Sequence, residues 1–159
     1  MDSIVKKSGK KGNATDTARS NAPQRLTYGI GNLDRALNRR LTDALAPFGI
    51  TLAQYTALSV LKSRGPSSNA KVADRSFITP QSANTVTSAM VARGWVAREP
   101  DPSHGRVILL CLTKEGAAML EQCDAEVRAI EARIIEGIRK TDVALFQELL
   151  GIFARNLRD

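Results

Sequence analysis

Five hydrogen-bonding side chains follow one another at short spacing in the middle of this chain: Gln81, Ser82, Asn84, Thr85 and Ser88. The amides of Gln and Asn can pair with the two major-groove groups of adenine, and a hydroxyl can donate, accept or contact a thymine methyl group. The set therefore predicts a surface that reads the base edges of duplex DNA. The alternative is a polar helix face that is merely solvated.

Cations around this set supply the charge that its members lack. Positions 62 to 106 hold seven basic residues against three acidic ones. Contacts from Lys and Arg to phosphates provide much of the affinity of DNA binding and most of its salt dependence. The candidates for phosphate contact are Lys62, Arg64, Lys71, Arg75, Arg93, Arg98 and Arg106. We expect His104 to add a hydrogen bond beside Arg106.

A helix followed by a hairpin is predicted to carry these side chains. Thr79 can cap the helix, Pro80 can occupy its first turn, and Gly94 can end it. Two β-rich runs, 95–98 and 107–112, then flank a polar turn that ends in a basic tip. A helix followed at once by such a hairpin is the outline of a winged helix.

Apolar residues at spacings of three and four predict further helices on both sides of this unit. They cover 24–47, 52 to the break at Gly65, about 69–76, 113 to about 137, and 143–157. Thr51 and Gln54 have the spacing of a capping box. The expected fold is mainly α with a small β-hairpin wing, as a winged helix-turn-helix region at 51–113 between terminal helices at 23–48 and 114–159.

The terminal helices carry long aliphatic stripes, from Leu26 to Leu45 and from Val143 to Leu157. A small winged domain cannot cover stripes of this length, and large exposed apolar patches are rare on monomers. We therefore expect 23–48 and 114–159 to form a homodimer, most commonly a two-fold one. The alternative is a monomer that folds these helices back on itself.

Composition favours an anionic partner. The formal net charge is +7 and the pI is about 9.8, which favours nucleic acid before an acidic membrane surface. Residues 1–22, rich in Lys, Ser, Gly, Asn and Thr, are expected to form a disordered basic tail. No apolar run has the length of a membrane span, and no apolar segment follows the N-terminal lysines as in a signal peptide.

Motifs of the common enzyme classes are missing from the sequence. It holds no GxSxG, P-loop or GxGxxG motif, and its one histidine cannot build a metal cluster with two distant cysteines. We therefore expect no catalytic residue, no metal and no cofactor. Two cysteines without a CxxC motif fit a reducing cytoplasm.

Five short segments, in this order and spacing, resemble the MarR family of bacterial winged-helix transcriptional regulators. They are Thr51-Leu52-Ala53-Gln54-Tyr55, Thr79-Pro80-Gln81-Ser82, Arg93-Gly94-Trp95-Val96, Asp101-Pro102 and Leu112-Thr113-Lys114-Glu115-Gly116. The resemblance extends from about Leu26 to the C-terminus. It implies a homodimer with interleaved terminal helices, a recognition helix in the major groove and a wing near the minor groove. It also implies repression that ends when a small, often aromatic acid binds or a cysteine is oxidised.

The chain departs from the family pattern in the wing and on the recognition helix. Where the family wing usually reads Asp-x-Arg, this chain has His104-Gly105-Arg106 and keeps only the arginine. Thr85 stands where an arginine is common on the recognition helix.

The resemblance further implies an effector pocket between the first two helices and the base of the long one. Tyr28, Asn32, Arg39 and Tyr55 are the candidate lining residues, and Arg39 could bind a carboxylate with two hydrogen bonds. The alternatives are a core role for Tyr55 and a surface role for Arg39.

The expected function is that of a homodimeric repressor of a pseudo-palindromic operator, released by a small aromatic carboxylate or phenol. One alternative is a regulator that senses oxidation of a cysteine, Cys111 or Cys123. Another is a constitutive architectural DNA-binding protein without a ligand response.

Overall fold

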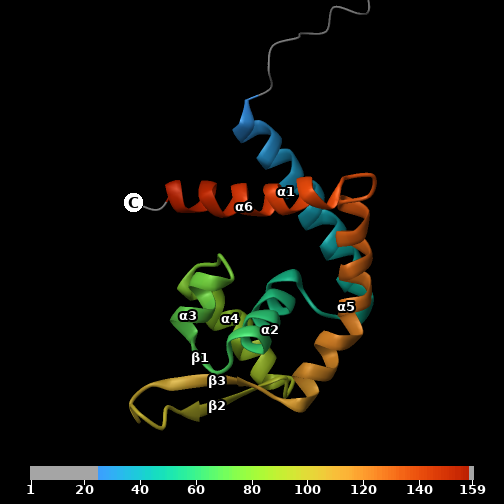
Figure 1. Cartoon of the computed structure of the whole chain (residues 1–159). Helices are drawn as coiled ribbons and strands as arrows, with labels where there is room; N and C mark the ends of the chain where they lie inside the picture. The colour runs from blue at the N-terminus through green and yellow to red at the C-terminus, as the bar shows by residue number, and fades with distance from the viewer. Residues whose placement is uncertain (1–24, 158–159) are drawn as a thin grey trace, which may run out of the picture. The chain divides into compact units, whose positions relative to one another are not determined.

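The computed structural model describes residues 25–157, so the tail expected at 1–22 lies outside the described residues. This part of the chain forms six α-helices, one short 3-10 helix and three strands (Figure 1). In chain order they are α1 (Leu26–Leu45), η1 (Ala46–Phe48), α2 (Leu52–Arg64), β1 (Ser67–Ser68), α3 (Asn69–Arg75), α4 (Pro80–Ala92), β2 (Val96–Pro100), β3 (Ile108–Leu112), α5 (Lys114–Ile134) and α6 (Lys140–Asn156). The mainly helical fold with a small β wing, predicted from the sequence, is confirmed.

The described residues fall into two compact units that divide within α1, residues 25–34 and residues 35–157. The smaller unit contains the first half of α1, in which Leu26, Ile30 and Leu33 are all exposed. The larger unit contains the second half of α1 and every later element. Within 25–157 no single helix is long and apolar enough to cross a membrane. One bent pair of helical segments, Leu26–Phe48 and Leu52–Arg64, reaches that length and composition when the two are taken together.

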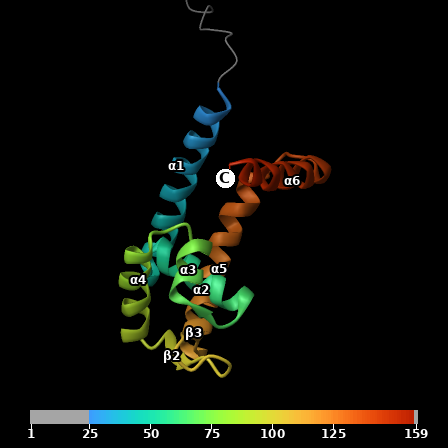
Figure 2. The ribbon, with the colours of Figure 1, turned by 90° about the vertical axis from the view of Figure 1, so that its left-hand side faces the viewer.

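The larger unit has an aliphatic core where α2, α3 and α4 pack on one another and on the sheet, and where α2 also packs on α5 (Figures 1 and 2). Leu58 and Leu61 of α2, Val72 of α3 and Met90 of α4 are at most 2% exposed. Burying an aliphatic side chain of this size contributes about 1.5–3 kcal/mol. These contacts therefore fix three short helices that would be marginal on their own.

Threonines cap three helices, and the sequence predicted the caps at Thr51 and Thr79. At the start of α2 the Thr51 hydroxyl accepts a hydrogen bond from the Gln54 backbone N–H, and the Gln54 side chain accepts one from the Thr51 N–H. At the start of α4 the Thr79 hydroxyl accepts one from the Ser82 N–H, and Thr113 caps α5 in the same way. Each such cap contributes about 1 kcal/mol, so the three helix starts are set by local sequence.

The sheet has three antiparallel strands in the order β1-β3-β2, where the sequence predicted only a hairpin. In that hairpin Val96 lies opposite Leu112 and Pro100 lies opposite Ile108. Pro100 is tolerated because β2 is an edge strand. The additional strand, Ser67–Ser68, pairs with β3. Two serines carry no β pattern, so this strand depends on a long-range contact that sequence reasoning could not find.

A tight backbone contact joins the end of α4, the start of β2 and the start of α5. The Thr113 hydroxyl donates to the Gly94 carbonyl over 2.7 Å, and the Thr113 N–H donates to the Trp95 carbonyl over 3.1 Å. Gly116 packs directly against Trp95, so that a Cβ at Gly116 would overlap the Trp95 carbonyl oxygen. Glycine is therefore the one residue that fits here without moving the backbone.

We predict that Gly116→Ala lowers the free energy of unfolding by about 1–3 kcal/mol, because the added methyl group must displace the backbone at Trp95. Gly105→Ala is the matched control, because a Cβ at Gly105 meets no atom within 4 Å. It should change stability by less than about 0.5 kcal/mol. Urea unfolding of both variants checks this, and equal stabilities would contradict the packing described.

Candidate nucleic-acid interface

The helix α4 divides into a buried and an exposed face. Ala83, Thr87 and Met90 are at most 1% exposed and point into the core. The five predicted base-reading side chains are all exposed: Gln81, Ser82, Asn84, Thr85 and Ser88. Next to this face, α4 contacts β2, and Figure 2 shows the helix running down to the hairpin. The candidate reading surface and the wing therefore belong to one rigid group of elements.

Asn84 has a partner on α3 that the sequence did not suggest. The Asn69 side-chain Nδ2 donates to Asn84 Oδ1 over 2.8 Å, and the Thr87 hydroxyl donates to Asn69 Oδ1 over 3.0 Å. Asn69 is half-buried and stands 15 residues before Asn84. No local pattern signals such a contact, because it depends on how α3 and α4 cross.

Two further reading candidates also have local partners. Ser88 accepts a hydrogen bond from the Arg98 guanidinium over 3.1 Å, which connects α4 to β2. The Ser82 hydroxyl accepts one from the Thr79 hydroxyl over 2.9 Å. These bonds orient the side chains at both ends of the exposed face, and both hydroxyls can still take part in a second hydrogen bond.

Arg93 is engaged away from the reading face of α4. Its guanidinium donates to the Gly49 carbonyl over 2.6 Å and lies over the Trp95 ring, 4.8 Å from the ring centre. Gly49 has a φ of 65°, in the left-handed region that glycine adopts without strain. These contacts connect the end of α4 to the turn before α2, so phosphate contact by Arg93 would compete with them.

Three cations of the predicted set are exposed and available for contact with phosphates. Among the described residues, the side chains of Lys71, Arg75 and Arg106 have no hydrogen-bond or ion-pair partner. Lys71 lies in the first turn of α3 and Arg75 at its end. Arg106 lies in the turn between β2 and β3, next to exposed His104. They are the strongest phosphate candidates because no local bond has to break first.

The wing turn is closed by hydrogen bonds of its own. Asp101 Oδ1 accepts from the Ser103 N–H over 2.8 Å, and the Asp101 N–H donates to the Val107 carbonyl over 2.8 Å. The Val107 N–H donates to the His104 carbonyl over 2.7 Å. Asp101 and the backbone thus shape the turn that presents Arg106, although His104 and Gly105 depart from the family pattern.

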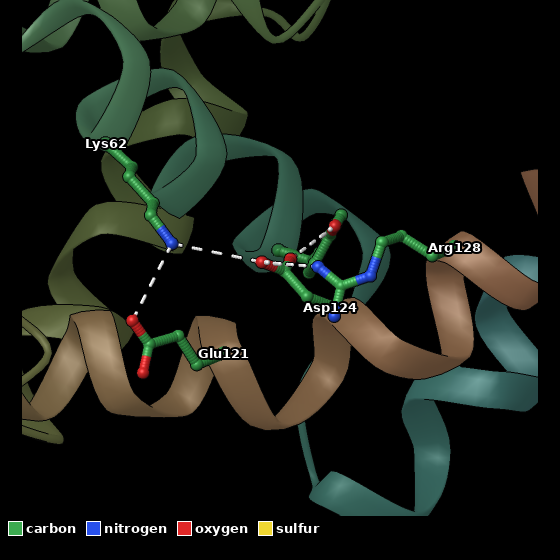
Figure 3. Close-up of polar contacts among 5 residues, drawn as sticks. Lys62, Glu121, Asp124 and Arg128 are labelled. Carbon is green, nitrogen blue, oxygen red and sulfur yellow. Dashed lines mark hydrogen bonds and ion pairs between the residues drawn. The ribbon is translucent and has the colours of Figure 1, made fainter.

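Acidic residues of α5 bind side chains of α2 (Figure 3). The Lys62 ammonium lies 4.0 Å from the Glu121 carboxylate and 3.9 Å from that of Asp124, so this phosphate candidate has acidic partners instead. Arg128 lies 3.8 Å from Asp124. The Tyr55 hydroxyl donates to Asp124 over 3.1 Å, and burial together with this bond raises the pKa of Tyr55 to about 12. Tyr55 is therefore a neutral donor in the contact between α2 and α5.

The four effector candidates are divided between the two units. Tyr28 and Asn32 belong to the smaller one, where Tyr28 is exposed and Asn32 half-buried. In the larger one Arg39 is exposed and Tyr55 half-buried. A half-open hollow of about 290 Å³ includes none of the four and is lined by Val60, Ser63, Arg64, Asp74, Arg75 and Phe77.

The environments of both cysteines lower their reactivity. Cys123 is fully buried and Cys111 is half-buried. Burial, followed by the neighbouring Glu99 carboxylate, raises the pKa of the Cys111 thiol. Burial, followed by Asp124, raises the pKa of Cys123. Less thiolate at neutral pH means slower oxidation. Among the described residues no group of three or more His, Cys, Asp or Glu could hold a metal ion.

Known sequences match this chain over most of its length. A family model described as the MarR family matches residues 48–107. The chain is 31% identical over 125 residues to the HTH-type transcriptional repressor Rv2887 of Mycobacterium tuberculosis, covering 79% of this chain and 90% of that protein. It is 27% identical over 122 residues to the multiple antibiotic resistance protein MarR of Escherichia coli, covering 76% of this chain and 85% of that protein.

Solved structures share the fold. CouR from Rhodococcus jostii, crystallised bound to p-coumaroyl-CoA, matches with a TM-score of 0.77 at 24% identity, covering 82% of this chain and 92% of CouR. A mutant MarR from Escherichia coli complexed with operator DNA matches with a TM-score of 0.71 at 26% identity, covering 80% and 92%.

Proposed function

Because the chain belongs to the MarR family of transcriptional regulators, we propose that it is a sequence-specific repressor that binds duplex DNA as a homodimer. It acts in the cytoplasm by binding alone, without a chemical step of its own. The exposed, uncharged face of α4 is the main support for this function, because it lies beside a wing that presents the unpaired cation Arg106. A surface that reads bases needs directional donors and acceptors, and a surface that holds phosphates needs cations.

In the proposed complex α4 enters the major groove and the wing lies over the neighbouring backbone. Gln81 and Asn84 carry amides that can bind base edges, while the hydroxyls of Ser82, Thr85 and Ser88 add weaker contacts. Lys71, Arg75, Arg98 and Arg106 contact phosphates or the minor groove, with His104 beside them. The mutant MarR structure contains operator DNA, which supports the same partner for this chain.

A second copy of the chain is the proposed cover for the apolar surfaces of the terminal helices. Leu26 is 62% exposed on α1, and Leu145 and Phe146 are 54% and 47% exposed on α6. Ile134 and Ile138, at and beyond the end of α5, are also exposed. Patches of this kind usually mark interfaces. Two-fold symmetry would then present two copies of α4 to two halves of a pseudo-palindromic operator.

The proposed effector is a small aromatic carboxylate or phenol that binds near Tyr28, Asn32, Arg39 and Tyr55. Arg39 is exposed and can bind a carboxylate, and Tyr55 keeps its proton at neutral pH. CouR was crystallised with an aromatic acyl thioester, p-coumaroyl-CoA, which is related to this chemical class. The raised pKa values of Cys111 and Cys123 favour a ligand over cysteine oxidation.

We predict that a substitution in the wing lowers the affinity for DNA, whereas a substitution in α4 lowers the preference for one base pair. Arg106→Ala should weaken binding and make the dependence of log K on log salt shallower by about one, because one phosphate contact is lost. Arg106→Lys, the matched control, keeps the cation and should keep the salt dependence. Asn84→Ala should instead reduce discrimination at one base pair by about 1–3 kcal/mol. Fluorescence anisotropy on duplexes checks both, and unchanged affinity and preference in both alanine variants would contradict these assignments.

We also predict that an aromatic acid releases the protein from DNA. A coupling of about 1–3 kcal/mol would weaken DNA binding by about 5- to 150-fold. Operator anisotropy titrated with benzoates, phenylacetates and cinnamates measures the release, and Arg39→Ala should bind DNA normally but respond less. No release by any of these acids, together with a release by peroxide that Cys123→Ser abolishes, would replace this proposal by oxidation sensing.

A further inference from the structure

Asn69, Asn84 and Thr87 form a chain of hydrogen bonds that runs from the core to the exposed face of α4. Thr87 is 1% exposed, Asn69 is half-buried and Asn84 is exposed. The Thr87 hydroxyl donates to Asn69 Oδ1 over 3.0 Å, and Asn69 Nδ2 donates to Asn84 Oδ1 over 2.8 Å. This series of hydrogen bonds therefore begins in the core at Thr87 and ends at Asn84, where the proposed base contacts are made.

We propose that Asn69 is a specificity-determining residue: it fixes the side-chain amide of Asn84 so that Nδ2 faces the major groove as a donor. The inference rests on the proposed function, because it concerns how Asn84 reads a base. Asn69 acts through Asn84 and is a positioning residue that does not touch the DNA.

In the structure the hydrogen bonds run outward from the buried Thr87 hydroxyl to Asn69 and then to Asn84. The reverse direction, in which Thr87 donates to the Asn84 backbone carbonyl and accepts from Asn69 Nδ2, is the alternative that the Asn69→Asp variant tests. A buried hydroxyl needs a hydrogen-bond partner, and Asn69 Oδ1 at 3.0 Å is nearer to Thr87 Oγ1 than the Asn84 backbone carbonyl at 3.3 Å. Once Oδ1 of Asn69 faces Thr87, its Nδ2 must face Asn84. The two orientations of an amide have nearly the same shape, so the hydrogen-bond partners decide between them. The Asn84 oxygen is thus held toward α3.

This orientation has a consequence for base preference. With Oδ1 bound to Asn69, Asn84 offers two N–H groups to the groove, and purine N7 is an acceptor there. Cytosine is the least suitable base, because its major-groove edge presents the N4 donor. The arrangement therefore favours a purine at the base that faces Asn84, because guanine presents two acceptors, N7 and O6, and adenine presents the acceptor N7.

The variant Asn69→Asp tests the direction of the hydrogen bonds that connect Thr87, Asn69 and Asn84. A carboxylate accepts from both sides, so in Asn69→Asp it accepts from the Thr87 hydroxyl and from Asn84 Nδ2. Asn84 must then turn and present Oδ1 to the groove, where it accepts from cytosine N4 or adenine N6. The added negative charge weakens binding to all duplexes alike, so the ratio between duplexes is the quantity to compare.

The experiment measures anisotropy with a duplex selected from a random library by the wild-type protein, and with its variants at each single base pair. The base pair read by Asn84 is the one at which Asn84→Ala loses its preference. There we expect a purine preference of about tenfold in the wild type. We expect Asn69→Ala to reduce it to about twofold and Asn69→Asp to move it toward cytosine, with preferences at the other base pairs unchanged.

The double variant separates positioning from direct contact. In an Asn84→Ala background, Asn69→Ala should cause no further change at this base pair. The inference is wrong if the losses in the double variant are additive. It is also wrong if Asn69→Ala leaves the preference unchanged or lowers it equally at all base pairs, or if the preference of Asn69→Asp does not move toward cytosine. If the wild-type protein selects no sequence at all, the proposed function itself fails, which is a distinct result.

Discussion

The close approach of Gly116 to the Trp95 backbone determines how α4, the wing and α5 meet. It fixes three elements at once, because Thr113 bonds to the carbonyls of Gly94 and Trp95 where α4 ends and β2 begins. The wing and the exposed face of α4 therefore keep one relative position. Because α5 starts at the same point, this long helix shares one junction with both proposed DNA-contacting elements.

The interface combines two kinds of polar side chain. Asn84, Ser88 and Ser82 are held by Asn69, Arg98 and Thr79, whereas Lys71, Arg75 and Arg106 have no bonded partner among the described residues. Side chains that are ordered before binding lose less entropy when they bind, which suits directional contacts to bases. A cation needs less orientation to attract a phosphate. The division therefore matches the proposed roles of helix and wing.

Local features were predictable from the sequence, and long-range contacts were not. The caps at Thr51 and Thr79 and the exposed polar side chains of α4 followed from spacing and residue type. The strand Ser67–Ser68 and the Asn69–Asn84 bond have no local signal, because both depend on how distant segments cross. The same limit applies to Lys62, which by charge alone was a phosphate candidate and in the structure lies beside acids of α5.

In the proposed complex two copies of the chain read one duplex through α4 and the wing. Selection of duplexes from a random library by the protein measures whether they do. Two recognition helices related by a two-fold axis must meet half-sites about one helical turn apart, or about 10 bp from centre to centre. We expect the selected sequences to form an inverted repeat with this spacing. Recovery of direct repeats or of unrelated sequences would contradict it.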